Sequence, residues 1–270
     1  ADYARPSAKQ TRFDRPTVAQ FAQTLFLSVR LLSIFSIWLT GAVAFAAESS
    51  LKLTKDDVVV FLGGTDMVRA QRSGHLETLL TANFKNDLPK FRDMSWEGDT
   101  VFALGTEIDR WRSGGFRGIK GLGNLETQLA TVKATVVIVQ LGKNEAFAGD
   151  EGVEAFTKGS DKLFGRLRGE DRQLIVLSPS PFEEADDPLY PDLRNRNDDL
   201  RRYVKALRVA AKNHEAIFVD LFTDARKTFT KNGLHVAPKN QAAFALHIGA
   251  ALGIERANGF EGLEDLRTSV

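Results

Sequence analysis

Residues 58–66 read Val-Val-Val-Phe-Leu-Gly-Gly-Thr-Asp, an apolar run that ends in two glycines and two polar residues. A short β-branched run bounded by turn residues is typical of a strand buried on both faces of a parallel sheet. The stretch 135–141, Thr-Val-Val-Ile-Val-Gln-Leu, has the same character and is also followed by a glycine. Helical patterns follow both runs, and this alternation favours an α/β fold.

Three weaker strands are predicted at 90–96, 173–177 and 216–219. Between the strands, apolar residues recur at helical spacing, which predicts amphipathic helices. We expect helices within 68–84, 125–132, 153–167, 197–214 and 238–252, and mostly loop over 105–124. Alternating strands and helices imply right-handed βαβ units. The fold class expected is α/β, a three-layer αβα sandwich with a parallel, flavodoxin-like five-stranded sheet.

The N-terminal segment has the layout of a secretory signal peptide. Arg12, Arg15 and Arg30 precede an uncharged run over 31–47 that ends in Ala44-Phe45-Ala46, a small-x-small pattern. Cleavage there would place the protein in the periplasm or outside the cell. The rival interpretation is an uncleaved membrane anchor, although the run is short for a membrane span.

With a signal peptide at the N-terminus, the chain is predicted to have three parts. Residues 1–47 are the N-terminal extension with the signal peptide, and 48–254 form the α/β domain. Residues 255–270 form a C-terminal tail that reads as the start of another helix and stops abruptly. Such an ending is compatible with a natural chain that continues beyond Val270.

Composition narrows the classes of function. A net charge of +1, with basic and acidic residues interleaved, argues against a nucleic-acid partner. The chain has no cysteine, which excludes thiolate catalysis, and none of its four histidines pairs with an acid at helical spacing. We therefore expect neither a metal nor a cofactor. The glycine-rich stretch 118–123 lacks the Gly-Lys-Ser/Thr ending of a phosphate loop.

Polar residues gather where the predicted strands end. Ligands of parallel α/β sheets bind beyond the carboxyl ends of the strands. Four segments there carry the candidate residues: Gly63-Gly64-Thr65-Asp66, Gly98-Asp99, Gly142-Lys143-Asn144-Glu145 and, before the last helix, Asn232-Gly233-Leu234-His235. Their order along the chain is hydroxyl, glycine, asparagine, histidine.

This order resembles the four blocks of the SGNH, or GDSL-like, hydrolases, over roughly 58–252. Gly142-x-Asn144 is similar to the family's Gly-x-Asn-Asp, with Glu145 where Asp is usual. Asn232-x-x-His235 is similar to its Asp-x-x-His, with Asn in the Asp position. The stretches 95–100 and 142–149 also look like a GDSL-like group of planctomycete type, whose first block departs from Gly-Asp-Ser.

The resemblance implies residue roles and an SGNH hydrolase-like domain at 48–254. Thr65 would be the nucleophile, His235 the general base and Asn232 the group that orients the imidazole. Backbone N–H groups at Gly64 and Gly98 and the Asn144 amide would bind the oxyanion. Because Asn232 lacks a charge, we name the acids Asp66, Asp99 and Glu145 as secondary candidates for the missing carboxylate.

Two functional hypotheses follow. The first is an exported hydrolase of carboxylic esters, such as acetyl esters of small molecules or glycans. The second is a catalytically impaired SGNH-like domain that binds a glycan or a protein partner, because threonine replaces serine and its methyl group crowds the reacting centre. A more distant reading is a flavodoxin-like cofactor binder.

For several of these residues a purely structural role is the alternative to a functional one. Thr65 can simply cap the following helix, and Asn144 can be a turn residue. Trp96 is either a packing residue or a wall of the cleft. We expect Ser178 and Ser180, which alternate with prolines, to belong to a loop rather than to act as nucleophiles.

Overall fold

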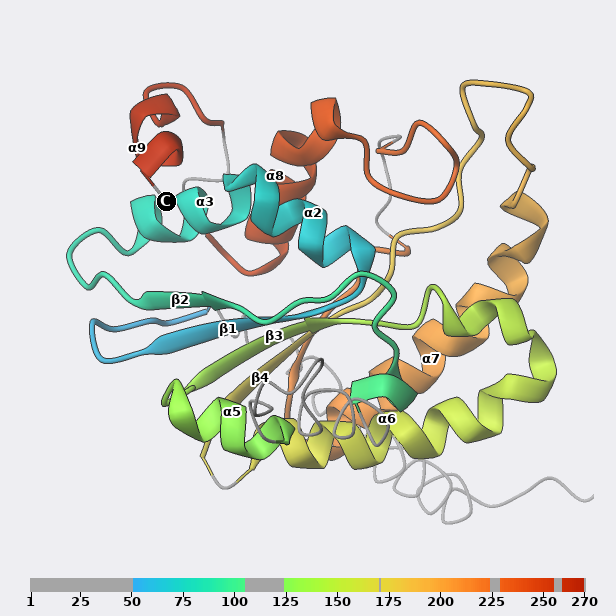
Figure 1. The fold of residues 1–270 in the computed structure, drawn as a ribbon, viewed down its shortest axis with the longest axis horizontal. Coiled ribbons are helices and arrows are strands. Elements are labelled where there is room, and N and C mark those ends of the chain that lie inside the picture. Colours follow the sequence, from blue (N-terminus) through green and yellow to red (C-terminus); the bar gives the residue numbers. More distant parts are fainter. Residues whose placement is uncertain (1–50, 105–123, 170, 224–228, 255–258, 270) are drawn as a thin grey trace, which may run out of the picture. The chain divides into compact units, whose positions relative to one another are not determined.

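The computed structural model describes residues 51–269 apart from 105–123, 170, 224–228 and 255–258 (Figure 1). The described residues belong to one compact unit, Ser49–Val270. The predictions for the N-terminal extension and for the loop at 105–123 therefore lie outside the described residues. No described helix is long and apolar enough to cross a membrane.

Five parallel strands form one sheet in the order β2-β1-β3-β4-β5, as the flavodoxin-like prediction required. The strands are β1 (Val58–Gly63), β2 (Lys90–Asp93), β3 (Val136–Gln140), β4 (Gln173–Leu177) and β5 (Ile217–Val219). The helices are α2 (Thr65–Ser73), α3 (His75–Asn83), α5 (Leu125–Thr131), α6 (Val153–Arg168), α7 (Asn197–Asn213), α8 (Gln241–Ala251) and α9 (Glu264–Ser269). Short 3₁₀ turns lie at η2 (Glu145–Ala148), η3 (Asp150–Gly152), η4 (Arg194–Arg196) and η5 (Pro238–Asn240).

The sheet has an apolar core on each face, because alternate residues of a strand point to opposite sides. Along β1, Val60 and Leu62 belong to one core, and Val59 and Phe61 belong to the other. Helices α5, α6 and α7 cover the first face, and α2, α3 and α8 cover the second, on the other side of the sheet (Figure 1). Two buried faces explain the continuous apolar runs in the sequence.

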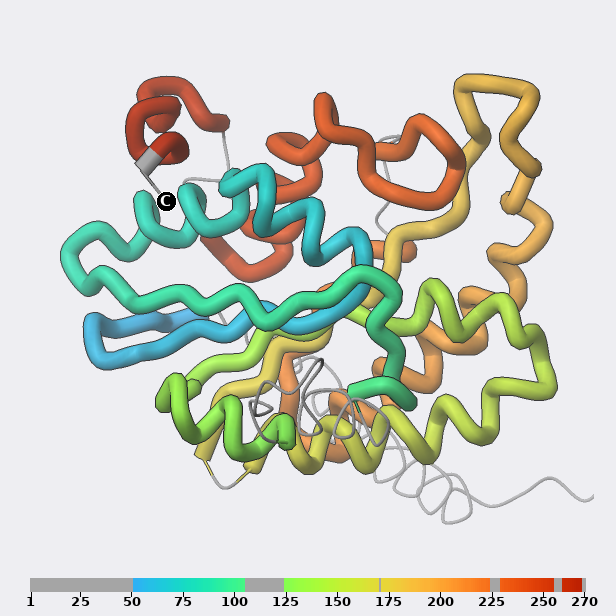
Figure 2. Tube along the Cα trace, viewed as in Figure 1, coloured from blue at the N-terminus to red at the C-terminus, as the bar shows by residue number. Residues whose placement is uncertain are grey.

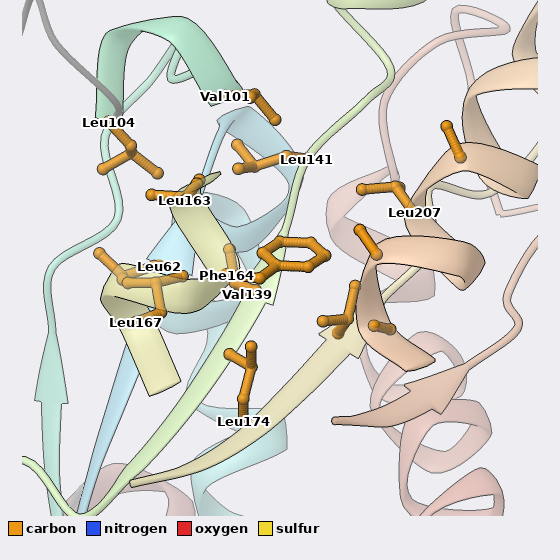
Figure 3. Close-up of a cluster of buried hydrophobic side chains, with 14 of the residues drawn as sticks. Leu62, Val101, Leu104, Val139, Leu141, Leu163, Phe164, Leu167, Leu174 and Leu207 are labelled. Carbon is orange, nitrogen blue, oxygen red and sulfur yellow. The ribbon is translucent and has the colours of Figure 1, made fainter. Parts of the chain in front are cut away.

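The first core shows how closely the helices follow the strands. Figure 3 shows Leu62, Val139 and Leu174 of the strands together with Phe164 of α6 and Leu207 of α7. Each of these five side chains is at most 1% exposed. Burying apolar side chains of this size stabilises a fold by about 1.5–3 kcal/mol each, so this core fixes where the carboxyl ends of β1 and β3 lie.

Three predicted elements differ from the structure. The helical stretch 68–84 is two helices, because Gly74 between them has a left-handed φ of +69°. Strand β2 ends at Asp93 rather than at 96, and as an edge strand it pairs with β1 alone. The last long helix begins at Gln241, after the 3₁₀ turn that Pro238 opens.

Candidate active site

The chain leaves the parallel strands β1 and β3 at the same edge of the sheet (Figure 2). Residues that follow these two strands line a pocket at this carboxyl edge. Segments far apart in the sequence meet there, as the crevice rule for parallel sheets predicts. Its lining combines a hydroxyl, a histidine, an amide and several charged groups. The lining residues are Gly64, Thr65, Asp66, Asp99, Gln140, Leu141, Gly142, Lys143, Asn144, Glu145, Pro179 and His235.

Gly63 and Gly64 determine the backbone path that places Thr65 in this pocket. Gly63 has a φ of +138°, and a Cβ there would overlap the carbonyl oxygen of Gln140 on the neighbouring strand β3. Gly64 is the N-cap of α2, so Thr65 is the first helical residue and not the cap that the structural alternative proposed. Because the first N–H groups of a helix have no intrahelical partner, the backbone N–H of Thr65 is a donor available at the pocket.

His235 faces a carboxylate that the sequence order did not assign to it. Its Nδ1 lies 3.2 Å from Oδ1 of Asp66, the residue beside Thr65. The Asn232 side-chain oxygen instead accepts hydrogen bonds from the backbone N–H groups of Leu234 at 3.2 Å and His235 at 2.9 Å. Asn232 therefore shapes the turn before His235, and Asp66 rather than Asn232 is the partner of the ring.

Asp66 is fully paired within the described residues. Oδ1 also accepts a hydrogen bond from the Val236 N–H at 3.1 Å, and Oδ2 lies 3.3 Å from Nζ of Lys143. Burial alone would raise the pKa of this carboxyl, but the Lys143 charge and the His235 and Val236 contacts outweigh it and lower the pKa to about 2.

The ionised Asp66 fixes the tautomer of the imidazole. A carboxylate can only accept hydrogen bonds, so Nδ1 of His235 must carry the proton that joins it to Oδ1. In the neutral ring this leaves Nε2 without a proton. His235 is thereby prepared to act as a general base through Nε2, the arrangement that a histidine–carboxylate pair provides in acyl transfer.

Asn144 and Gly64 occupy neighbouring positions in the pocket. Asn144 is exposed and lies in the turn just before η2, as its structural interpretation predicted, but its side chain makes no cap hydrogen bond. Its amide nitrogen lies 3.9 Å from the position that a Cβ on Gly64 would take. The side-chain N–H₂ of Asn144 and the N–H of Thr65 are thus two donors near one point.

Glu145 holds the two loops that flank these donors. Its carboxylate accepts hydrogen bonds from the N–H groups of Val101 at 2.7 Å and Gly142 at 2.9 Å. Burial raises the pKa of Glu145, and these backbone contacts act against that rise. Glu145 therefore joins the loop after β2 to the loop after β3, and it is not hydrogen-bonded to His235.

Of the predicted segment Gly98-Asp99, only Asp99 lines the pocket. Asp99, which is 3% exposed, lines the pocket, whereas Gly98 is exposed and is not among the lining residues. The Asp99 backbone is close to Gly64, with its carbonyl oxygen 3.2 Å from the Cβ position of that glycine. Of the nine predicted site residues, the pocket brings together all except Gly98 and Asn232.

The two serines after β4 have structural roles. Ser178 Oγ accepts hydrogen bonds from the N–H groups of Leu221 and Phe222, at 2.9 and 3.1 Å. Ser180 is 1% exposed, and its hydroxyl lies 3.0 Å from Nζ of Lys143. Neither lines the pocket, in keeping with the loop role expected for them. Trp96, in contrast, is 63% exposed.

Sequence reasoning missed Lys143. This lysine is buried, lines the pocket and contacts the residue that orients the imidazole. Its position between Gly142 and Asn144, inside the third block, was the available signal. Across the described part of the chain, no group of three or more His, Cys, Asp or Glu side chains could hold a metal ion.

Solved structures share this architecture at low sequence identity. A gut microbial diltiazem-metabolizing enzyme superposes with a TM-score of 0.59 at 16% identity, over 77% of this chain and 49% of its own. This chain thus spans about half the length of that protein. A protein described as a GDSL-like lipase, from Parabacteroides merdae, gives 0.56 at 17% identity, over 76% of this chain and 100% of its own. Axe2, an acetylxylan esterase from Geobacillus stearothermophilus, superposes with a TM-score of 0.54 at 16% identity, over 76% of this chain and 98% of its own.

Together, the parallel sheet and the pocket at its carboxyl edge define an α/β protein with the SGNH hydrolase fold. The family model for GDSL-like lipases and acylhydrolases matches residues 108–248, just over half of the chain. The chain belongs to this family. The match covers the asparagine and histidine blocks and begins after Thr65 and Gly98. A comparison with curated protein sequences gave no match.

Proposed function

We propose that this chain hydrolyses carboxylic esters by an acyl-transfer reaction that uses Thr65 and His235. The observation that carries the proposal is the 3.2 Å contact between His235 and Asp66, in the pocket that Thr65 also lines. The sequence lacks the family's acid at position 232, and Asp66 supplies a carboxylate to the imidazole from another element. Family membership supports the same reaction class.

The proposed reaction has two halves. Oγ1 of Thr65 attacks the ester carbonyl carbon while its proton passes to Nε2 of His235. The tetrahedral intermediate collapses, the C–O bond to the alcohol breaks, and His235 returns the proton to the leaving oxygen. Water then attacks the acyl-threonine with His235 again as base, which releases the carboxylic acid and restores Thr65.

The developing oxyanion needs fixed hydrogen-bond donors. The Thr65 N–H at the start of α2 and the Asn144 amide are two such donors in the pocket. Removing one donor of this kind typically costs about 2.7–4 kcal/mol of transition-state stabilisation. The positive end of the α2 dipole adds a favourable field at the same place.

For the substrate, we propose small acyl esters, with acetyl groups on glycans as the leading class. The acetylxylan esterases among the solved structures of this fold support that choice. Trp96 is exposed, and its backbone N–H bonds the carbonyl of Gly63, next to the pocket residue Gly64, so it offers an aromatic surface of the kind that packs on sugar rings. No metal or cofactor enters the proposed reaction.

A second candidate function rests on Thr65 itself. Its β-branched side chain has a restricted χ1, and its methyl group occupies space beside a tetrahedral centre. A domain with this residue could retain the pocket as a binding site for a glycan or a protein while its hydrolytic step is lost.

Hydrolysis of 4-nitrophenyl acetate by residues 48–270 tests the two candidates. We expect turnover well above background, with Thr65→Ala and His235→Ala reduced to background because each removes a reacting group. Acetylated xylo-oligosaccharides then test the substrate class. Equal rates for wild type and both variants would reject hydrolysis, and binding of the same oligosaccharides without turnover would favour the second candidate.

We also propose that the protein is exported, on the strength of the basic and apolar pattern before Glu48. Expressed in a bacterial host as the full chain with an added start methionine, it should appear in the periplasm or medium. N-terminal sequencing of that product should begin within 45–50. A membrane-bound product that retains residues 31–47 would instead support the anchor reading.

A further inference from the structure

Lys143 is a buried cation that the acyl-transfer steps do not use. Its side chain is 9% exposed, and the ammonium group contacts three oxygen atoms from three separate segments. These are Asp66 Oδ2 at 3.3 Å, Ser180 Oγ at 3.0 Å and the Leu234 carbonyl at 2.6 Å. The Phe182 ring lies 5.9 Å from Nζ on a further side. Burying a charged lysine costs free energy unless the charge is paired and hydrogen-bonded. These partners offset that cost, but they do not explain why a lysine is buried at this position.

The contacts divide the Asp66 carboxylate between two partners. Nζ of Lys143 contacts Oδ2, and Nδ1 of His235 contacts Oδ1. Through the Leu234 carbonyl, the same ammonium also holds the residue immediately before His235. One cation therefore restrains both the carboxylate and the backbone that carries the imidazole.

A direct catalytic use of Lys143 with Ser180 fits the structure poorly. Ser180 is 1% exposed and does not line the pocket, so an ester carbonyl has no approach to its hydroxyl. Nζ of Lys143 also donates hydrogen bonds to Oδ2 of Asp66 and to the Leu234 carbonyl, so its contacts are those of a donor and not of a base.

We infer that Lys143 is a positioning residue for His235: by binding Oδ2 of Asp66 and the Leu234 carbonyl, it aligns Oδ1 with the imidazole Nδ1. This inference rests on the proposed ester hydrolysis. It deepens that proposal by assigning the buried lysine of the third block to the histidine of the fourth. Charged groups around the pair include Asp99 and Glu145, which line the same pocket, and Arg69 of α2, whose guanidinium lies 3.4 Å from the Val236 carbonyl.

The test compares kcat and KM from pH 4 to pH 9 for the wild type, Lys143→Met and Lys143→Gln. Glutamine keeps a hydrogen-bond donor but removes the charge. We expect kcat to fall by about 10²-fold, since a small misplacement of a reacting group costs roughly that much, with KM within about threefold. The matched control is Lys158→Gln, which breaks a solvent-exposed lysine–glutamate pair on α6 and should change neither constant.

The pH profile separates positioning from general stability. In the wild type, Asp66 stays ionised down to about pH 2, so its protonation does not limit activity above pH 4. Without the Lys143 charge, burial raises the pKa of Asp66, and its protonation then removes the imidazole partner at a higher pH. The acidic limb of kcat should therefore move upward in both Lys143 variants and stay in place in the Lys158 control.

Three outcomes would overturn the inference. One is a folded variant with unchanged kcat and pH profile, and another is a loss of kcat with an unshifted acidic limb. The third is failure of both variants to fold, which would assign Lys143 to stability instead. Failure of the proposed function is distinguishable, because the wild type would then match Thr65→Ala. In that case the ¹⁵N shifts of the His235 ring remain as readout: the Nδ1–H tautomer should dominate in the wild type and lose population in Lys143→Gln.

Discussion

Replacing Asp66 with asparagine is expected to lower kcat by about 10³–10⁴-fold while KM changes little. In a serine protease, the corresponding aspartate-to-asparagine change costs roughly 10⁴ in kcat, largely because the histidine takes the wrong tautomer. The same reasoning applies here, since the ionised Asp66 is what places the proton on Nδ1 of His235. The measurement is the steady-state hydrolysis of 4-nitrophenyl acetate at neutral pH.

The chain offers a matched control for this substitution. Asp161 and His214 form a second carboxylate–imidazole contact, also 3.2 Å long, and neither residue lines the pocket. Asp161→Asn removes the same charge from the same kind of pair and should leave kcat within about twofold. A folded Asp66→Asn protein with wild-type kcat would show that another group orients the imidazole, and it would remove the observation on which the proposed function rests.

The buried strands could be predicted from the sequence, because parallel strands covered on both faces must be apolar throughout. Strands β1, β3 and β4 are such runs, and each prediction is right to within one or two residues. The edge strand β2 was predicted too long, since its residues are mostly exposed and its length depends on pairing with β1. The break at Gly74 depends on a backbone conformation that glycine permits but does not require.

The site was predictable where it follows from strand order and not where it depends on side-chain contacts. Thr65 and Asn144 lie in one pocket because β1 and β3 are neighbouring parallel strands. The pairing of Asp66 with His235 joins residues 169 positions apart, and no spacing rule selects Asp66 over Asp99 or Glu145. Asn232 resembled the family's acid by spacing, yet a side chain three residues before another can equally bond its backbone N–H.

Gly63→Ala is expected to lower the free energy of unfolding by about 2–6 kcal/mol. A methyl group at this position overlaps the Gln140 carbonyl oxygen and lies 3.2 Å from the Gln140 nitrogen, and both atoms are backbone of a buried strand. Forcing extra volume into packed structure costs about 1–3 kcal/mol, and the φ of +138° adds a further cost of about 1–3 kcal/mol for a non-glycine residue. Urea or guanidinium unfolding of both proteins measures the difference.

Gly149→Ala separates the two contributions. Gly149 also has a positive φ, +64°, but a Cβ there meets nothing within 4 Å, so only the backbone cost of about 1–3 kcal/mol should appear. The excess loss in Gly63→Ala then measures how closely β1 and β3 approach just before Thr65. Equal losses in the two variants would mean that the strands can separate at Gln140 without much cost. The position of Thr65 opposite Asn144 would in that case not be held by the sheet, and the rigid placement that acyl transfer requires would have to come from the contacts of Asp66 alone.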